Sequence, residues 1–178
     1  MLIEVLLAKL CGVKNVLVHG HSTRTNHPFI HTILKHPMMW LSRECIACSE
    51  ATGTWIYGSH PYTLLNNAVE LDKFRFEETL RQQYRKEFGI REEFLIGHIG
   101  HFTEPKNHFF LMDVFAAFHK LEPNSKLLLI SDGPRFQQVQ EKAAQLGLQD
   151  AVIFAGRRSD VAGIYSAMDL FILPSCWE

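Results

Sequence analysis

Several features that would set a chain apart from ordinary globular proteins are scarce in this sequence. Its 178 residues include only four cysteines, too few for a disulfide framework in a chain of this size. Neither sign of charge dominates, because 18 Lys and Arg face 19 Asp and Glu, so no electrostatic footprint for nucleic acid is present. No apolar run approaches the roughly 20 residues that cross a bilayer, and Glu4 stands where a signal peptide would be basic. We therefore expect a cytoplasmic protein that does not bind nucleic acid.

Two of the cysteines, Cys45 and Cys48, have the CxxC spacing found in zinc and redox sites. The surrounding residues favour a strand, on which positions i and i+3 point to opposite faces. No second CxxC follows. We therefore expect two small thiols of the kind that pack in protein cores, and no metal site.

The second half of the sequence alternates apolar runs with helical stripes. Short apolar runs predict buried strands, and apolar residues at spacings of three and four predict helices. The predicted strands cover 94–100, 126–131, 151–155 and 169–174, and the predicted helices cover 108–121, 136–146 and 159–167. Near-continuous apolar strands joined by helices are typical of a parallel sheet covered on both faces. The predicted fold class is therefore α/β.

The residues before about 75 have weaker patterns. They predict helices over 2–10 and 52–57, and strands over 15–18, 44–47 and 63–65. The stretch 72–93 contains six acidic and six basic residues, which predicts a solvated, charged helix between the two halves of the chain.

The first candidate site follows the strand predicted over 94–100. In open parallel sheets ligands bind outside the carboxyl ends of the strands. There, Gly100 and His101 begin a loop that reaches Lys106 and leads into a helix. Glycine lets the backbone approach a ligand, the helix start offers N–H groups, and lysine adds a positive charge, a combination that suits a phosphate. An ordinary strand-to-helix loop with a surface lysine explains the same residues equally well.

The next two predicted strands end in further polar residues. Gly133 lies in an Asp-Gly-Pro sequence that is as typical of a plain turn as of a site. Arg157 and Arg158 could pair with an anion at a helix entrance. Ion pairs within the protein, to Asp160 or Glu141, explain these arginines equally well.

Two isolated residues complete the candidate set. Glu178 follows the fourth predicted strand of the second half, although one carboxylate alone indicates little. His21 follows a short apolar strand in the first half, where an imidazole can act as an acid, a base or a sugar ligand. Most of the ten histidines in such a chain are structural or solvated.

Four segments of the second half carry a resemblance to a known family. Residues 96–108 contain a pattern similar to GxxGRF…KNH, and residues 127–134 are similar to LLLvGdGp. Residues 152–161 are similar to ViFlGxRxDV, and residues 167–178 to amDvfvlPSxxEG. In this order and spacing, together with His-Gly-His-Ser at 19–22, the chain resembles GT-B glycosyltransferases of family four, of the exopolysaccharide and capsule type.

The resemblance implies transfer of a sugar from a nucleotide-sugar donor to a hydroxyl of a saccharide or lipid-linked acceptor, with retention at the anomeric carbon. We expect a UDP-sugar as the donor, and the nucleotide sugar is a substrate rather than a cofactor. No metal or cofactor is implied. The resemblance also allows peripheral association of a full-length enzyme with the inner face of the membrane.

The resemblance also assigns roles to the candidate residues. Lys106 matches a lysine that holds the donor diphosphate, whereas His101 stands where the family has an arginine. Arg157 or Arg158 would have to supply the missing cation. The glycines Gly100 and Gly133 belong to the donor-binding motifs.

Two residues receive catalytic roles by the same resemblance. Glu178 matches the first glutamate of the family's E-x7-E motif, which contacts the donor sugar. His21 matches a histidine of the N-terminal domain that approaches the donor sugar and the acceptor.

The resemblance finally predicts an incomplete enzyme with two parts. Residues 1–72 would be the end of an acceptor-side domain with its linker, and residues 73–178 a partial, Rossmann-like donor-binding domain. Because the second glutamate of the motif and the first strands of the acceptor-side domain are absent from the sequence, we expect weak or no activity of this piece alone. Two other functions stay open, a non-catalytic nucleotide-binding fragment and a GT-B-like nucleotide-sugar epimerase.

Overall fold

The chain forms two compact units, each with its own sheet and core. The computed structural model describes residues 2–23, 25 and 27–177. The first unit comprises residues 1–69 and the second comprises residues 70–178. Three strands form the sheet of the first unit, and four form the sheet of the second.

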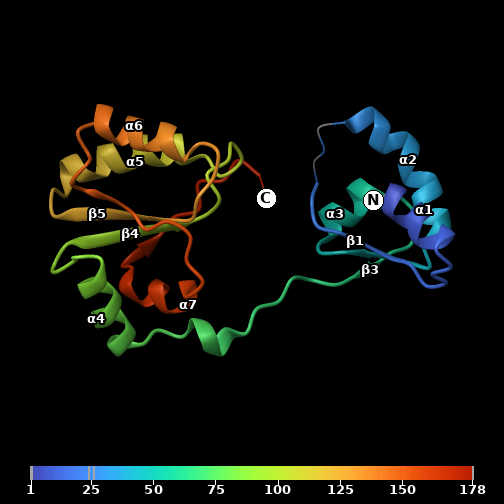
Figure 1. The fold of residues 1–178 in the computed structure, drawn as a ribbon, viewed down its shortest axis with the longest axis horizontal. Coiled ribbons are helices and arrows are strands. Elements are labelled where there is room, and N and C mark those ends of the chain that lie inside the picture. Colours follow the sequence, from blue (N-terminus) through green and yellow to red (C-terminus); the bar gives the residue numbers. More distant parts are fainter. Residues whose placement is uncertain (1, 24, 26, 178) are drawn as a thin grey trace. The chain divides into compact units, whose positions relative to one another are not determined.

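The second unit is a parallel sheet between two layers of helices. The strands lie in the order β6-β5-β4-β7 and are β4 (Phe94–Ile99), β5 (Ser125–Ile130), β6 (Val152–Phe154) and β7 (Leu170–Phe171). The helices are α4 (Glu78–Glu87), α5 (His108–Leu121), α6 (Phe136–Gln145) and α7 (Val161–Ile164), with 3-10 turns η1 (Leu71–Phe74) and η2 (Tyr165–Ala167). Helices α5 and α6 cover one face and α4 and α7 the other (Figure 1). The predicted α/β architecture is confirmed.

The central strand β5 explains why this half of the sequence is so apolar. Leu127 and Leu129 join the core beneath α5 and α6. Leu128 and Ile130 join the core on the side of α4 and α7. None of these four side chains is more than 1% exposed. Because each one leaves water completely, each contributes roughly 2 kcal/mol of hydrophobic stabilisation.

The first unit is a smaller parallel sheet with three helices. Its strands lie in the order β1-β2-β3 and are β1 (Leu17–Gly20), β2 (Glu44–Ala47) and β3 (Thr63–Leu64). Its helices are α1 (Leu2–Leu10), α2 (Pro28–Leu41) and α3 (Glu50–Tyr57). The buried Tyr57 hydroxyl donates to the carbonyl oxygens of Val18 and Ile46, at 3.0 and 2.8 Å, and so connects β1 to β2. Burial raises the pKa of Tyr57 to about 12.

The structure departs from the sequence-based expectation at two helices. The patterns predict no helix at α2, which contains Pro37 in its interior and exposes apolar side chains such as Phe29 and Trp40. The charged stretch 72–93 is not one long helix, because η1 is followed by extended residues and α4 extends only from Glu78 to Glu87. Gly89, with φ of +67°, then turns the chain toward β4.

The cysteines of the CxxC pair are small packed side chains. Cys45 is buried in the first unit, and Cys48 is half-buried with its Sγ 3.6 Å from Thr52 Oγ1. All four cysteines are free thiols. Among residues 2–23, 25 and 27–177, no group of three or more His, Cys, Asp and Glu side chains could hold a metal ion.

Candidate functional site

The loops at the carboxyl ends of β4, β5, β6 and β7 lie along one edge of the second sheet, because the four strands are parallel. We call this edge the carboxyl rim; its loops are residues 100–107, 131–135, 155–160 and 172–177. Backbone hydrogen bonds of 2.8 Å join neighbouring loops, and they are donated by Phe102 to Asp132, by Ser131 to Gly156 and by Cys176 to Pro105. The rim is therefore one connected surface.

Backbone strain is concentrated at the carboxyl rim. In the described part of the chain, the non-glycine residues with positive φ are Asn107 at 52° and Ser131 at 133°. Gly133 and Gly156 at the same rim have φ of 153° and 65°. Non-glycine residues in such conformations cost of order 1–3 kcal/mol each, and they collect at ligand sites and switches. The strain therefore marks this edge as a functional candidate.

The loop after β4 has the geometry of an anion cradle. The aliphatic part of Lys106 packs over Gly100, since a Cβ on Gly100 would lie 3.4 Å from Lys106 Cδ. Helix α5 begins directly after the left-handed Asn107, whose side chain makes no capping hydrogen bond. The N–H groups of its first turn and the positive end of its dipole therefore lie beside the lysine.

Three charged or polar side chains meet where the first three rim loops approach each other. Asp132 Oδ1 lies 3.3 Å from His101 Nδ1 and accepts a hydrogen bond of 3.1 Å from Arg157 Nη2. The Arg157 guanidinium holds the pKa of the Asp132 carboxyl below its usual range. His101 and Asp132 are each half exposed and Arg157 is three-quarters exposed, so all three are accessible from solvent. Sequence reasoning treated Asp132 only as part of a turn, although its position after a buried strand was the available signal.

Gly133 and Arg158 have other surroundings in the structure. A Cβ on Gly133 would come within 2.6–2.9 Å of the Phe102 backbone, so this glycine permits two rim loops to touch. Arg158 donates to both Asp160 oxygens, at 2.8 and 2.6 Å, and to Glu87 Oε1 at 2.6 Å. Hydrogen bonds from Arg158 lower the pKa of Asp160 to about 2. Arg157, rather than Arg158, thus shares a cluster with His101.

The candidate Glu178 lies outside the described residues. The nearby Cys176 donates its N–H to the Pro105 carbonyl, immediately before Lys106. This contact brings the segment after β7 to the loop after β4.

The candidate His21 lines a cavity of about 450 Å³ in the first unit. Its ring centroid is 4.0 Å from that of His19. His31 of α2 and Trp55 of α3 also line the cavity, and their rings stack with centroids 4.3 Å apart and planes 5° apart. Sequence reasoning missed His31 because it did not predict α2. The remaining lining is largely apolar and includes Ile30, Leu34, Met38 and Ile56.

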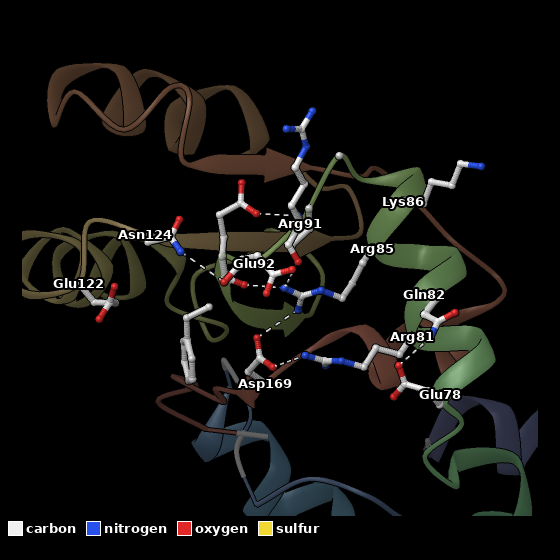
Figure 2. Close-up of a pocket in the computed structure, with 14 residues that line it drawn as sticks. Glu78, Arg81, Gln82, Arg85, Lys86, Arg91, Glu92, Glu122, Asn124 and Asp169 are labelled. Atoms are coloured by element: carbon white, nitrogen blue, oxygen red, sulfur yellow. Dashed lines mark hydrogen bonds and ion pairs between the residues drawn. The ribbon is translucent and has the colours of Figure 1, made fainter.

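A larger cavity of about 970 Å³ lies at the opposite edge of the second sheet. We call this edge the amino rim; it is formed by α4 with residues 89–94, 122, 124 and 169 (Figure 2). Arg81 and Arg85 of α4 both bind Asp169, at 2.6 and 3.2 Å. Arg85 also donates to the carbonyl oxygens of Ala167, Arg91 and Glu93. The two arginines are thus occupied by the protein itself.

The Asp169 carboxylate is equally committed. It accepts a 2.7 Å hydrogen bond from the Leu95 N–H at the start of β4. Burial opposes its ionisation, but the hydrogen bonds from Leu95 and Arg81 hold the pKa of Asp169 below its usual range. The amino rim is therefore a structural clamp between α4, β4 and β7.

The fold and the carboxyl rim define an α/β protein with a candidate site for an anionic ligand. A family model described as "Glycosyl transferases group 1" matches residues 81–178, more than half of the chain. The chain belongs to this family.

Relatives and solved structures extend the comparison to nearly the whole chain. EpsF of Bacillus subtilis (strain 168), named as a glycosyltransferase, is 26% identical over 97% of this chain and 48% of its own length. The N-acetyl-alpha-D-glucosaminyl L-malate synthase of Bacillus anthracis is 38% identical over 52% of this chain and 24% of its own. Alr3699/HepE of Anabaena, solved with UDP and glucose, shares the fold with a TM-score of 0.84 at 20% identity, over 98% of this chain and 50% of its own. The chain thus spans about half the length of EpsF and of HepE.

No helix in the described ranges has the length and apolar character needed to cross a bilayer.

Proposed function

We propose that the whole protein transfers a sugar from a nucleotide-sugar donor to an acceptor hydroxyl in polysaccharide biosynthesis, with retention at the anomeric carbon. The main support for this proposal is found at the carboxyl rim. Lys106, the start of α5 and the cluster of His101, Asp132 and Arg157 lie together there, on loops with positive-φ residues. We propose UDP as the nucleotide, which is supported by the complexes of HepE with UDP and UDP-glucose.

The proposed chemistry follows from charge. As the bond between the sugar and the diphosphate breaks, negative charge grows on the leaving diphosphate. An ammonium group and helix N–H groups that are already directed at it stabilise this charge without reorganisation. Lys106 and the first turn of α5 would do this here, and Arg157, held by Asp132, would add a second cation. We propose that these groups suffice and that no metal or other cofactor takes part.

We propose that the first unit binds the acceptor in the cavity beside His21. The cavity combines apolar walls with imidazole groups and the stacked pair of His31 and Trp55. His19 Nε2 and His31 Nε2 are buried without a hydrogen-bond partner among the described residues, so a hydroxyl-bearing ligand would satisfy them. Such a lining suits a saccharide or a lipid-linked saccharide.

We further propose that the protein works in the cytoplasm, at the inner face of the membrane. The support is the set of exposed apolar side chains on α1 and α2, which include Leu7, Leu10, Phe29 and Trp40. Exposed apolar faces of amphipathic helices can lie in a membrane interface.

The proposal is tested first by calorimetric titration of the 178-residue chain with UDP. Lys106→Ala should weaken UDP binding about 10- to 100-fold, because a hydrogen bond from a charged group contributes about 1.5–3 kcal/mol. The control is Lys86→Ala, which removes an exposed lysine at the amino rim and should leave the affinity unchanged. Absence of UDP binding, or equal effects of the two substitutions, would contradict the proposal.

A product assay with a UDP-sugar separates transfer from the two other functions. Release of UDP together with a glycosylated acceptor is the expected result. An isomerised UDP-sugar would instead indicate an epimerase, and binding of UDP by a catalytically complete protein without turnover would indicate a non-catalytic module.

A further inference from the structure

Two fully buried histidines lie beneath the rim loop of residues 100–107. His98, in β4, is 0% exposed, and His108, the first residue of α5, is 2% exposed. Their ring centroids are 4.8 Å apart and the rings meet edge to face. A buried imidazole is costly unless its polar atoms have partners, so the contacts of this pair indicate what it does.

Each histidine of the pair contacts a different part of the carboxyl rim. His98 Nδ1 lies 2.9 Å from the carbonyl oxygen of Ile172, just after β7. The backbone of Gly100 is within hydrogen-bonding reach of the His108 imidazole, and this imidazole stacks on the ring of Phe102 with centroids 4.0 Å apart and planes 16° apart. Nε2 of His108 has no hydrogen-bond partner in the described part of the chain, which leaves Nδ1 as the nitrogen available to the Gly100 backbone.

The loop also approaches the pair closely at Gly100. A Cβ on Gly100 would lie 2.7 Å from His98 Nε2, and the same position lies 3.4 Å from Lys106 Cδ. The His98 imidazole and the aliphatic part of Lys106 thus both approach Gly100 on the side where a Cβ would lie. A change in either ring would move the backbone on which Lys106 rests.

The surroundings keep His108 uncharged at neutral pH. Burial and the neighbouring His98 lower the pKa of His108 to about 4, and the cations that face it from the loop, Lys106 and His101, act in the same direction. A neutral imidazole has one donor nitrogen, and donation to the Gly100 backbone requires the proton on Nδ1.

We propose that His98 and His108 are positioning residues that hold the loop of residues 100–107 in its ligand-binding conformation. Neither residue touches the ligand in this account; they act through Gly100, Phe102 and Lys106. An apolar residue could fill the same volume but could not donate to the Gly100 backbone, and sites held about 1 Å too loosely lose much of their function. The inference rests on the proposed function, because it takes a nucleoside diphosphate as the ligand of the loop.

The test compares UDP affinity with stability in three variants. His108→Phe keeps a ring against Phe102 but removes the donor to Gly100. His108→Asn removes the ring but keeps an amide nitrogen close to the place of Nδ1. His119→Phe is the matched control. His119 lies in the last turn of α5, away from the rim, and its half-buried imidazole bonds the Ser125 hydroxyl.

We expect the UDP affinities of the three variants to differ in a way that does not follow their melting temperatures. UDP affinity should fall at least about 10-fold in His108→Phe and stay within about threefold of wild type in His108→Asn and His119→Phe. The inference would be overturned if His108→Phe bound UDP as tightly as wild type. It would also be overturned if His108→Asn lost as much UDP affinity as His108→Phe and the loss paralleled the fall in melting temperature. If wild type itself binds no UDP, the proposed function fails instead.

A second measurement uses the wild-type protein and does not depend on the folding of a variant. Addition of UDP should shift the imidazole nitrogen resonances of His108 together with the amide resonances of Gly100 and His101. Amide shifts at the loop without any change at His108 would overturn the inference.

Discussion

The two edges of the second sheet contain similar side chains but use them differently. At the amino rim, Arg81 and Arg85 are bound to Asp169 and to backbone carbonyls, and α4 is fixed to the sheet (Figure 2). At the carboxyl rim, His101 and Arg157 are at least half exposed, and the backbone carries the left-handed strain of non-glycine residues. The cavity of about 970 Å³ lies at the amino rim, yet its strongest charges are already satisfied within the protein.

The comparison indicates that cavity size is a poor guide to function in this molecule. Paired charges that are largely shielded from solvent stabilise the fold, whereas solvent-exposed charges on strained loops are accessible to a ligand. Substitutions at the amino rim should therefore reduce stability, and substitutions at the carboxyl rim should reduce ligand affinity.

The largest effect on stability is expected from Asp169→Ala at the amino rim. The substitution leaves the guanidinium groups of Arg81 and Arg85 without their carboxylate and the Leu95 N–H without its acceptor. Leaving a buried donor without its acceptor costs about 1–3 kcal/mol. Arg85 and the Leu95 N–H both lose an acceptor here, so we expect a total loss of about 3–4 kcal/mol although Asp169 itself is partly exposed. Urea unfolding followed by circular dichroism should show this loss, while the protein that remains folded should keep its UDP affinity. A loss below about 1 kcal/mol would contradict the clamp.

A slightly smaller loss of stability is expected when the pH is lowered, because His108 at the carboxyl rim is protonated more easily in the unfolded chain. The pKa of His108 is about 4 in the folded protein, against a reference value of 6.5. The unfolded chain therefore binds more protons between these values. The contribution of His108 to the free energy of unfolding is complete above pH 6.5 and is lost as the pH falls toward 4. The shift corresponds to at most about 3 kcal/mol. Urea unfolding between pH 4 and pH 7 should show a shallower pH dependence in His108→Asn than in wild type, and an identical dependence would contradict this assignment.

The smallest effects on stability are expected from substitution of one glycine at each rim, which compares the two edges directly. Gly133→Ala places a Cβ against the Phe102 backbone at a φ of +153°, whereas Gly89→Ala has a φ of +67° with no atom within 4 Å. We expect a loss of about 2–3 kcal/mol for Gly133→Ala and about 1 kcal/mol for Gly89→Ala. Only Gly133→Ala should also weaken UDP binding. Equal stability and equal affinity in the two variants would mean that the rim loops do not need their close contact.

Much of the second unit was predictable because its signals are local. The run of Leu127 to Ile130 identifies a strand buried on both faces. The stripe of Phe110, Leu111, Val114, Phe115 and Phe118 identifies α5. Helix α2 was not predictable in the same way. Pro37 interrupts its pattern, and its exposed apolar residues obscure which face is buried.

The candidate site likewise contains residues that could be predicted from local sequence and contacts that could not. Lys106 and Arg157 could be proposed from their positions after buried strands. The bond from Arg157 to Asp132 joins residues 25 positions apart, and the clamp from Arg81 to Asp169 joins residues 88 apart. Contacts of this range depend on strand order, which no local pattern encodes. His98 looks in sequence like one more polar residue in an apolar strand, and only the packing shows that it lies beneath Gly100.

The central comparison is tested most directly by mapping UDP onto the second unit through changes in backbone amide resonances. The account predicts that the shifts cluster in the carboxyl-rim loops, at residues 100–107, 131–135 and 155–158, and that the amino rim stays unchanged. Shifts that cluster instead around α4, residues 89–94 and Asp169 would contradict it.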